Sequence, residues 1–242
     1  MIFVDASEGL SGDMLLAGML ALLDTDTLEA TRGLMSDAAD AQGVEFRLNT
    51  IDDEDDKGLG ISYLRPEPAH YGASYEECFS RLASIEADLK SSSPIGRVVL
   101  EHIFGAEAEA HGVPAREVHL HEIARPQAML NIAGIGKVSS VLLDNGAEGF
   151  TCSTIVTGSG LVVVSHGAIR VPAPASRILL RGLRHEPGTS PGERATPTGI
   201  AAVKALVRSQ TDELPRGFSK KGIGFGTKRF AGRLGRTSLY WA

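Results

Sequence analysis

The chain has few of the features that would mark a secreted, membrane-spanning or aromatic-rich binding protein. Its 242 residues include two cysteines, one tryptophan and 5% aromatic residues. Cys78 and Cys152 cannot form the disulfide framework of a small secreted domain, so both are expected to be free thiols. No run of about 18 apolar residues occurs, and we therefore expect no membrane-spanning helix. The start, MIFVDASEGLSGD, lacks the basic region of a signal peptide, and a cytoplasmic protein is expected.

The acids and bases are unevenly divided along the chain. Residues 1–150 carry 26 acids and 10 bases, whereas residues 151–242 carry 4 acids and 14 bases. Such halves either pack against each other or present a basic face to an anionic ligand. Nucleic acid is not an expected partner, because the net charge is −6 and few aromatic residues accompany the bases.

Alternation of strand-like and helix-like segments predicts the α/β class, with a mixed α+β fold as the alternative. We expect a single compact unit or two subdomains divided near residues 145–150. Helices are predicted at 13–24, 75–89, 95–111, 126–143, 172–183 and 196–209 from apolar spacing and capping residues. The capping signals include Ser11, a capping box of Ser74 with Glu77, and Pro126 in a first turn. Strands are predicted at 2–5, 44–51, 60–64, 118–122, 150–156, 160–165, 218–230 and 237–241. The acidic run 52–58 is interpreted as a solvated turn.

The loop between the first strand and the first helix is a candidate site. Free N–H groups at a helix start favour anions, and Gly12 permits close approach to the backbone. However, Asp5, Glu8 and Asp13 oppose a phosphate unless a divalent cation bridges them, and carboxylates at a strand end suit Mg²⁺ or another hard ion. The alternative is a tight turn in which an acid stabilises the helix start.

His119 and His121 are candidate metal ligands. Residues two apart in a strand share a face, so both imidazoles can approach one ion, and Glu122 could complete its shell. The alternative is a polar strand face that carries histidines without a metal. His166 and His70 are further candidates that spacing alone does not attach to the site. The remaining histidines, His102, His111 and His185, are interpreted as surface or helix-packing residues.

Two segments near the C-terminus could hold an anion. The run GIGFG at 222–226 is flanked by bases, and its glycines would let a phosphate approach the backbone. It lacks the full phosphate-loop and dinucleotide patterns, so a bulged or crowded strand is the alternative. Thr196 is a predicted helix cap, with Pro197 in the first turn, and the exposed N–H groups there are a second candidate anion site.

Five segments in this order resemble the LarC-type nickel insertion family. They are DASEGLSGDM (5–14), HGVPAREVHLHEI (111–123), HGAIRVPAPA (166–175), ERATPTG (193–199) and KKGIGFGTKR (220–229). The resemblance covers almost the whole chain. It implies CTP-dependent insertion of nickel into a pyridinium bis-thiocarboxylate mononucleotide, a step in making the nickel-pincer cofactor of lactate racemase.

The matching positions supply the candidate site residues. Candidate catalytic acids are Asp5, Asp13 and Glu122, and candidate nickel ligands are His119, His121 and His166. Candidate nucleotide-binding residues are Ser11, Gly12, Thr196, Thr198, Gly199, Lys221, Gly222, Gly224 and Gly226. Mg²⁺ or Mn²⁺ accompanying a nucleotide is compatible with the same acids.

The sequence departs from the family pattern after the H-x-H-E element. There the family reads close to G-A-V-D-S-I-V-D-I, and this chain reads A-R-P-Q-A-M-L-N-I. Gln127 and Asn131 replace carboxylates and Ala128 replaces a serine; an amide cannot act as a general base and is a poorer cation ligand. Positions 127 and 131 are predicted to share one helical face, so one local site is altered. The family's histidine-rich insertion is also missing, and only His70 precedes the S-Y helix.

The chain stops where the family's C-terminal, CTP-handling domain would begin, so a separate CTP-handling subunit is an expected partner. Three hypotheses remain open. The chain is a nickel-insertion-like protein that binds a divalent metal, a phosphorylated pyridinium nucleotide or both; or it is a non-catalytic paralogue that serves as a binding or assembly module; or it is an unrelated cytosolic enzyme of a nucleotide-like substrate. A homo-oligomer is compatible with each.

Overall fold

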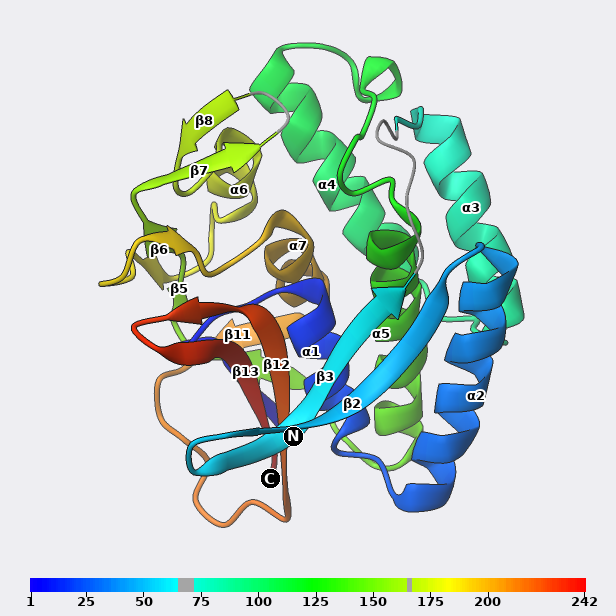
Figure 1. Ribbon diagram of the computed structural model, residues 1–242, viewed down its shortest axis with the longest axis vertical. Helices are drawn as coiled ribbons and strands as arrows, with labels where there is room; N and C mark the ends of the chain where they lie inside the picture. Colours follow the sequence, from blue (N-terminus) through cyan, green and yellow to red (C-terminus); the bar gives the residue numbers. More distant parts are fainter. Residues whose placement is uncertain (65–71, 165–166) are drawn as a thin grey trace.

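A seven-stranded mixed sheet forms the centre of the fold (Figure 1). The computed structural model describes residues 1–64, 72–164 and 167–242. The strand order is β11-β4-β1-β13-β12-β3-β2. The bounds are β1 Ile2–Asp5, β2 Glu45–Asp53, β3 Asp56–Leu64, β4 Phe150–Cys152, β11 Val207–Gln210, β12 Lys220–Phe230 and β13 Arg233–Trp241. Strands from both sides of residues 145–150 share this sheet, and a division into subdomains there stays a prediction.

The sheet contains both parallel and antiparallel pairs of strands. β4 runs parallel to β1 and β11, and β3 runs parallel to β12. The pairs β2–β3 and β12–β13 are antiparallel hairpins, and β13 also pairs antiparallel with β1. The expected mixed α/β class is therefore confirmed.

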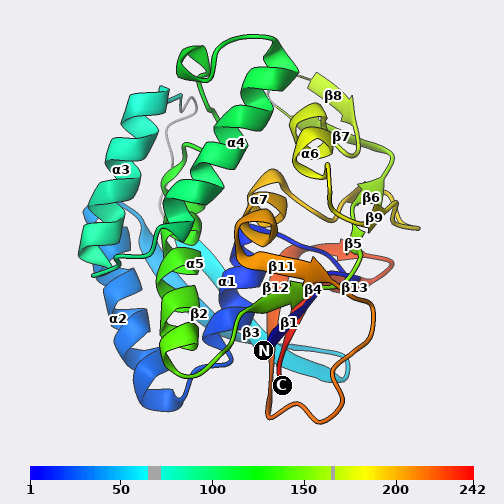
Figure 2. The same cartoon turned by 180° about the vertical axis from the view of Figure 1, so that it is seen from behind.

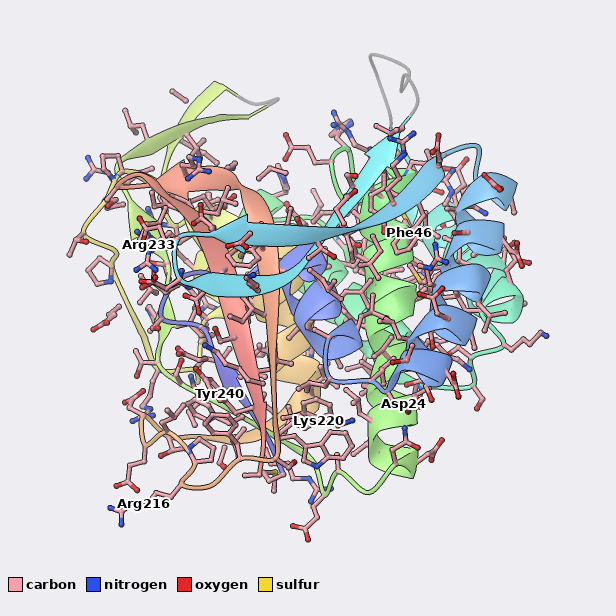
Figure 3. The ribbon with its side chains drawn as sticks, turned by 60° about the horizontal axis from the view of Figure 1, so that its bottom comes forward. Asp24, Phe46, Arg216, Lys220, Arg233 and Tyr240 are labelled. Carbon is pink, nitrogen blue, oxygen red and sulfur yellow. The ribbon has the colours of Figure 1, made fainter. Side chains whose placement is uncertain are left out.

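Helix α1 lies between the sheet and α5, and the other long helices surround α5 and cover the same side (Figures 2 and 3). The helices are α1 Gly12–Leu20, α2 Thr25–Ala41, α3 Tyr75–Asp88, α4 Ile95–His111, α5 Pro126–Asp144, α6 Pro174–Leu179 and α7 Pro197–Leu206. Eight of the nine residues of α1 are buried, so this helix is part of the core on all sides. Among the described residues, no helix is both long and apolar enough to cross a membrane.

Six short strands form three small ladders beside the main sheet. β5 Ile155–Val156 pairs with β9 His185–Glu186, and β6 Gly158–Ser159 pairs with β10 Gly192–Glu193. β7 Leu161–Val164 and β8 Gly167–Arg170 form a hairpin that leads into α6. This region brings β10 and the start of α7 next to the N-terminal end of α1.

Several predicted boundaries are wrong. The expected strand at 118–122 is, among the described residues, a single bridge between Leu120 and Ala73, preceded by a 3-10 turn at Ala115–Glu117. The first helix ends at Leu20 and not at residue 24. Asp24 instead caps α2, which was not predicted. The helices expected at 172–183 and 196–209 are shorter, and 207–210 is the edge strand β11.

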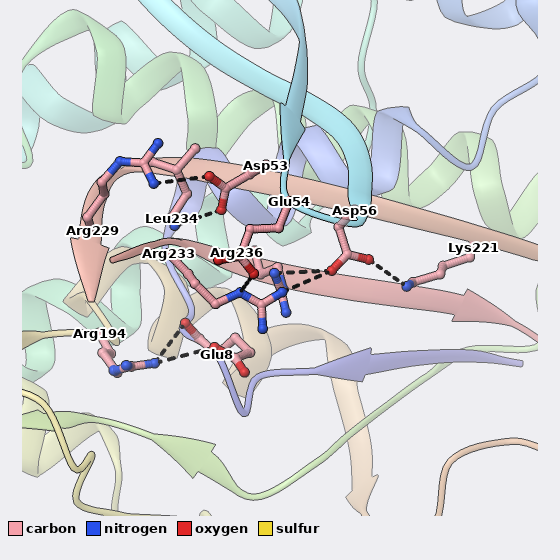
Figure 4. A network of polar contacts seen from close by, with 10 residues as sticks. All are labelled: Glu8, Asp53, Glu54, Asp56, Arg194, Lys221, Arg229, Arg233, Leu234 and Arg236. Atoms are coloured by element: carbon pink, nitrogen blue, oxygen red, sulfur yellow. Dashed lines mark hydrogen bonds and ion pairs between the residues drawn. The ribbon is translucent and has the colours of Figure 1, made fainter. Parts of the chain in front are cut away.

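The acidic turn between β2 and β3 is not simply solvated; it docks on the basic β12–β13 hairpin (Figure 4). The ion pairs are Asp53–Arg229 at 3.1 Å, Glu54–Arg233 at 2.7 Å, Asp56–Lys221 at 3.2 Å and Asp56–Arg236 at 3.1 Å. The backbone N–H of Leu234 also donates to Asp53, and this hydrogen bond is the main cause that lowers the pKa of the carboxyl. Part of the charge asymmetry of the chain is thus satisfied inside the fold.

Candidate functional site

A pocket of about 490 Å³ lies where the N-terminal ends of α1, α5, α6 and α7 approach one another. The elements around it are far apart in sequence, from Ser11 at the start of α1 to Lys228 in β12. Its size falls in the range of about 300–1,000 Å³ typical of small-molecule sites. The lining combines hydroxyls, carboxylates, imidazoles and apolar side chains.

The starts of α1 and α7 form one wall of the pocket. Ser11 caps α1 by accepting from the N–H of Met14, and its hydroxyl donates to Asp13 at 2.5 Å. Thr196 caps α7 by accepting from the N–H of Gly199. A helix cap leaves other N–H groups of the first turn free to meet a ligand. This wall therefore offers backbone donors and hydroxyls together.

Backbone hydrogen bonds hold these two helix starts together. The N–H of Leu10 donates to Arg194 O at 2.8 Å, and the N–H of Thr196 donates to Leu10 O at 2.9 Å. A Cβ atom at Gly199 would lie 2.6 Å from Leu10 O, and one at Gly12 would lie 2.8 Å from Cγ2 of Thr198. Both glycines are therefore needed for the close approach of the helices.

The first turns of α5 supply a second wall. Asn131 is buried, and its Oδ1 accepts a 2.8 Å hydrogen bond from the hydroxyl of Tyr63 on β3. Burial, with a smaller contribution from Asp13, holds the pKa of Tyr63 well above its usual range, so the phenol stays protonated. Ala128 also lines the pocket, whereas Gln127 does not; its Oε1 is buried with no hydrogen-bond partner among the described residues. Of the two amides that replace carboxylates of the family pattern, Asn131 is therefore the one that lines the pocket.

The segment after the 3-10 turn carries the two candidate metal ligands. His119 and His121 are exposed and line the pocket, while Leu120 between them is buried. Both imidazoles thus lie at one pocket, although the segment is not a strand. Nδ1 of His119 lies 3.2 Å from the carbonyl O of Glu117. Glu122 lines the same pocket.

Carboxylates outnumber bases in the pocket. Asp13, Glu107, Glu122 and Glu193 line it, and Lys228 is the one lysine or arginine among the described lining residues. Burial raises the pKa of Glu193; Lys228 opposes that shift and Glu122 adds to it. His111, expected to be a surface or packing residue, lies at the pocket edge with its Nε2 3.5 Å from Glu107 Oε2. An anion would therefore have to be bound by hydrogen-bond donors, because the lining has no excess of positive charge.

No group of three or more histidine, cysteine, aspartate or glutamate side chains within the described ranges is close enough to hold a metal ion. His166 and His70, both candidate ligands, lie outside the described residues. The described part of the site therefore contributes three imidazoles, those of His111, His119 and His121, and separate carboxylates rather than a closed metal cage.

Asp5 is not brought into this pocket. It lines a second pocket of about 360 Å³, together with Thr154 and Asp212, and its carboxylate accepts from the N–H of Ser7 at 3.0 Å. Asp5 ends β1, and the chain from Ser7 to Ser11 carries the motif away before Asp13 reaches the first pocket. Asp5 and Asp13 belong to one motif but therefore line two different pockets.

The glycines of β12 also lie outside the pocket. A Cβ atom at Gly222 would lie 2.4 Å from Gly18 O, and one at Gly224 would lie 1.8 Å from Met14 O. One at Gly226 would lie 2.9 Å from Sδ of Met14. These glycines let α1 pack directly on the strand, which matches the crowded-strand alternative.

Sequence reasoning missed Tyr63, Glu193 and Lys228. Glu193 lies in the quoted segment ERATPTG and Lys228 lies in KKGIGFGTKR. Spacing could not show which positions of each segment line the pocket. Tyr63 lies in a predicted strand with no motif around it. Only the contact with Asn131 identifies it.

The fold and the pocket define a mixed α/β protein with a polar small-molecule site built on helix starts. The chain belongs to the nickel insertion protein family, whose model matches residues 2–237. A relative from Pelobacter propionicus, named for the same family, is 31% identical over 95% of this chain and 57% of its own length. Two relatives carry the name pyridinium-3,5-bisthiocarboxylic acid mononucleotide nickel insertion protein. The one from Staphylococcus saprophyticus is 28% identical over 95% of this chain and 56% of its own length. The one from Thermotoga sp. is 30% identical over 93% and 57%.

The chain therefore spans just over half the length of these curated relatives. No solved structure is significantly similar to it.

Proposed function

We propose that this chain binds a phosphorylated pyridinium nucleotide together with nickel as a second substrate, and so takes part in nickel insertion. The observation that carries the proposal is the meeting of two helix N-termini with two imidazoles around one pocket. The relatives' names specify the same pair of chemical groups, a mononucleotide and nickel.

The helix starts provide the anion-binding end. The N-termini of α1 and α7 carry partial positive charge, which favours phosphate. Backbone N–H donors come from the first turn of each helix, except at Pro197, which has none. The hydroxyls of Ser11, Thr196 and Thr198 add further donors on the same wall. Asp13 stands beside them, and we propose that Mg²⁺ or Mn²⁺ bridges its carboxylate to the nucleotide.

The opposite side provides the nickel-binding end. Imidazole nitrogen is a good ligand for Ni²⁺, and sulfur ligands suit borderline and soft metals. We propose that His119 and His121 hold the incoming ion, that Glu122 assists, and that the thiocarboxylate sulfurs of the nucleotide complete its shell. Two protein ligands bind a metal less tightly than a closed cage, which suits an ion that must be handed on.

The test is calorimetric titration of the chain with NiCl₂, comparing wild type with a His119→Ala, His121→Ala double variant. We expect the double variant to weaken Ni²⁺ binding at least about tenfold, because about 1.4 kcal/mol of lost coordination corresponds to that factor. The matched control is His102→Ala, His185→Ala, which removes two imidazoles that do not line the pocket. Absence of Ni²⁺ binding to wild type, or equal losses in both double variants, would contradict the metal-binding part of the proposal.

A second candidate function is ligand binding without turnover. It is favoured by the neutral side chains of Ala128 and Asn131 on the wall where the family has a serine and a carboxylate. Asn131→Asp separates the two functions: a carboxylate there should tighten Ni²⁺ binding if the amide weakened the site. An unchanged affinity would favour a pocket that does not use this position for metal.

The relatives extend well beyond the region that this chain spans. We propose that the complete reaction takes place in the cytoplasm and needs CTP-handling residues from outside this region, supplied by a separate subunit.

A further inference from the structure

The lysines and arginines of the β12–β13 hairpin, apart from Lys228, each have an ion-pair or hydrogen-bond partner among the described residues. Lys228 lines the pocket. Lys221, Arg229, Arg233 and Arg236 all pair with carboxylates of the β2–β3 turn (Figure 4). Lys220 donates to the carbonyl O of Leu22 at the other end of the hairpin. Lys228 is exposed, and no described residue forms a hydrogen bond or an ion pair within 4 Å with its ammonium group.

Lys228 and its neighbour Arg229 reach different parts of the molecule. Successive residues of a strand point to opposite faces, and Lys228 also lies where the register of β12 on β13 shifts, between Phe225 and Arg229. Arg229 pairs with Asp53 of the acidic turn, whereas Lys228 lines the pocket.

Contacts on either side fix the position of Lys228 relative to the helix starts. At residue 226, a Cβ atom would touch the side chain of Met14, in the first turn of α1. At Phe230, the ring lies 4.5 Å from the guanidinium carbon of Arg194, two residues before the cap of α7. Lys228 lies between these two contacts, and its charge acts on Glu193. It is therefore placed beside both helix starts.

From this geometry we infer that Lys228 is the residue that binds the phosphate of the nucleotide. The inference rests on the proposed function, which places an anion at the starts of α1 and α7. A lysine acts as a flexible point charge toward phosphate and complements the backbone donors of a helix start. The acids of the pocket make this single cation more important, because no other lysine or arginine among the described lining residues can offset a phosphate charge.

The test compares two probes that differ by one phosphate, nicotinate mononucleotide and nicotinate riboside, by calorimetry. Lys228→Met should weaken mononucleotide binding by roughly tenfold to a hundredfold and leave riboside binding unchanged, since a charged hydrogen bond is worth about 1.5–3 kcal/mol. Lys228→Arg should keep most of the affinity. The matched control is Lys220→Met, the same change in the same strand at its far end (Figure 3), which should alter neither affinity. Thermal melts of each variant check that the fold is retained.

The possible outcomes separate this inference from the proposed function. If Lys228→Met weakens both probes equally, or neither, Lys228 does not bind the phosphate and the inference fails. The same follows if wild type binds mononucleotide and riboside equally well. If wild type binds neither probe, the proposed nucleotide site itself is wrong, and the inference fails with it.

Discussion

Replacing Gly224 with alanine tests whether the glycines of β12 serve helix packing or ligand binding. A Cβ atom at residue 224 would lie 1.8 Å from the carbonyl O of Met14 and 2.6 Å from the N of Gly18. Both atoms belong to the backbone of α1, so no side-chain rotation relieves the clash. Ordinary contact begins at 3.4 Å, so α1 would have to move away from β12 by roughly 1.6 Å.

Helix α1 cannot make that movement without losing packing elsewhere. It is buried between the sheet and α5, with eight of nine residues inaccessible. An extra methyl group in a well-packed core costs about 1–3 kcal/mol, and a clash with backbone places Gly224→Ala at about 3 kcal/mol or more. For a chain of this size, each kcal/mol lowers the melting temperature by about 2–4 °C, so a fall of about 6–12 °C is expected.

Urea denaturation followed by circular dichroism measures the free energy of unfolding directly. Gly105→Ala in α4 is the matched control, because its added Cβ would have no described atom within 4 Å apart from the backbone of its own helix and its chain neighbours. That variant should gain about 0.5–1 kcal/mol from the better helix propensity of alanine. A Gly224→Ala protein within about 0.5 kcal/mol of wild type would refute the packing argument. If that stable protein had also lost nicotinate mononucleotide binding, the ligand-binding interpretation of the strand would be restored.

Two further substitutions test the polar contacts that position the site. Tyr63→Phe removes the donor to Asn131 Oδ1 and should cost about 1–3 kcal/mol in urea denaturation, because a buried acceptor loses its partner; a change near zero would show that this bond is not needed. Asp53→Asn should destabilise the protein at pH 7, since the Leu234 N–H and Arg229 lower the folded-state pKa of Asp53. That contribution is present above the unfolded pKa and is lost as pH falls through the folded pKa, so urea midpoints of variant and wild type should converge in acid; a constant difference would contradict the linkage.

Local features of the fold were predictable from the sequence because their causes are local. Ser74 and Glu77 form the expected capping box, and Ser11 and Thr196 cap the helices they precede. Pro126 occupies the first turn of α5 as expected. Helix α2 was missed because it carries few large apolar residues; its four buried residues are Thr31, Met35, Ala38 and Ala39.

Which motif residues meet was not predictable, because it depends on contacts between distant elements. Asp5 and Asp13 belong to one quoted segment, yet they line different pockets. Lys221 and Lys228 belong to one strand, yet Lys221 pairs with Asp56 and only Lys228 lines the pocket. Spacing in sequence shows that two residues share a segment, but it does not show which distant element each of them contacts.

The last third of the chain is basic, but most of this charge does not act at the pocket. Four of its bases are paired with the acidic β2–β3 turn, so their charge is used to attach one hairpin to another. The pocket itself is lined by more carboxylates than cations. The phosphate binding that we propose must therefore come from short-range donors at two helix starts and from Lys228, with acids nearby that penalise wrongly placed anions. Such a site selects by geometry rather than by net charge, because misplacing the phosphate moves it from fixed N–H donors toward carboxylates.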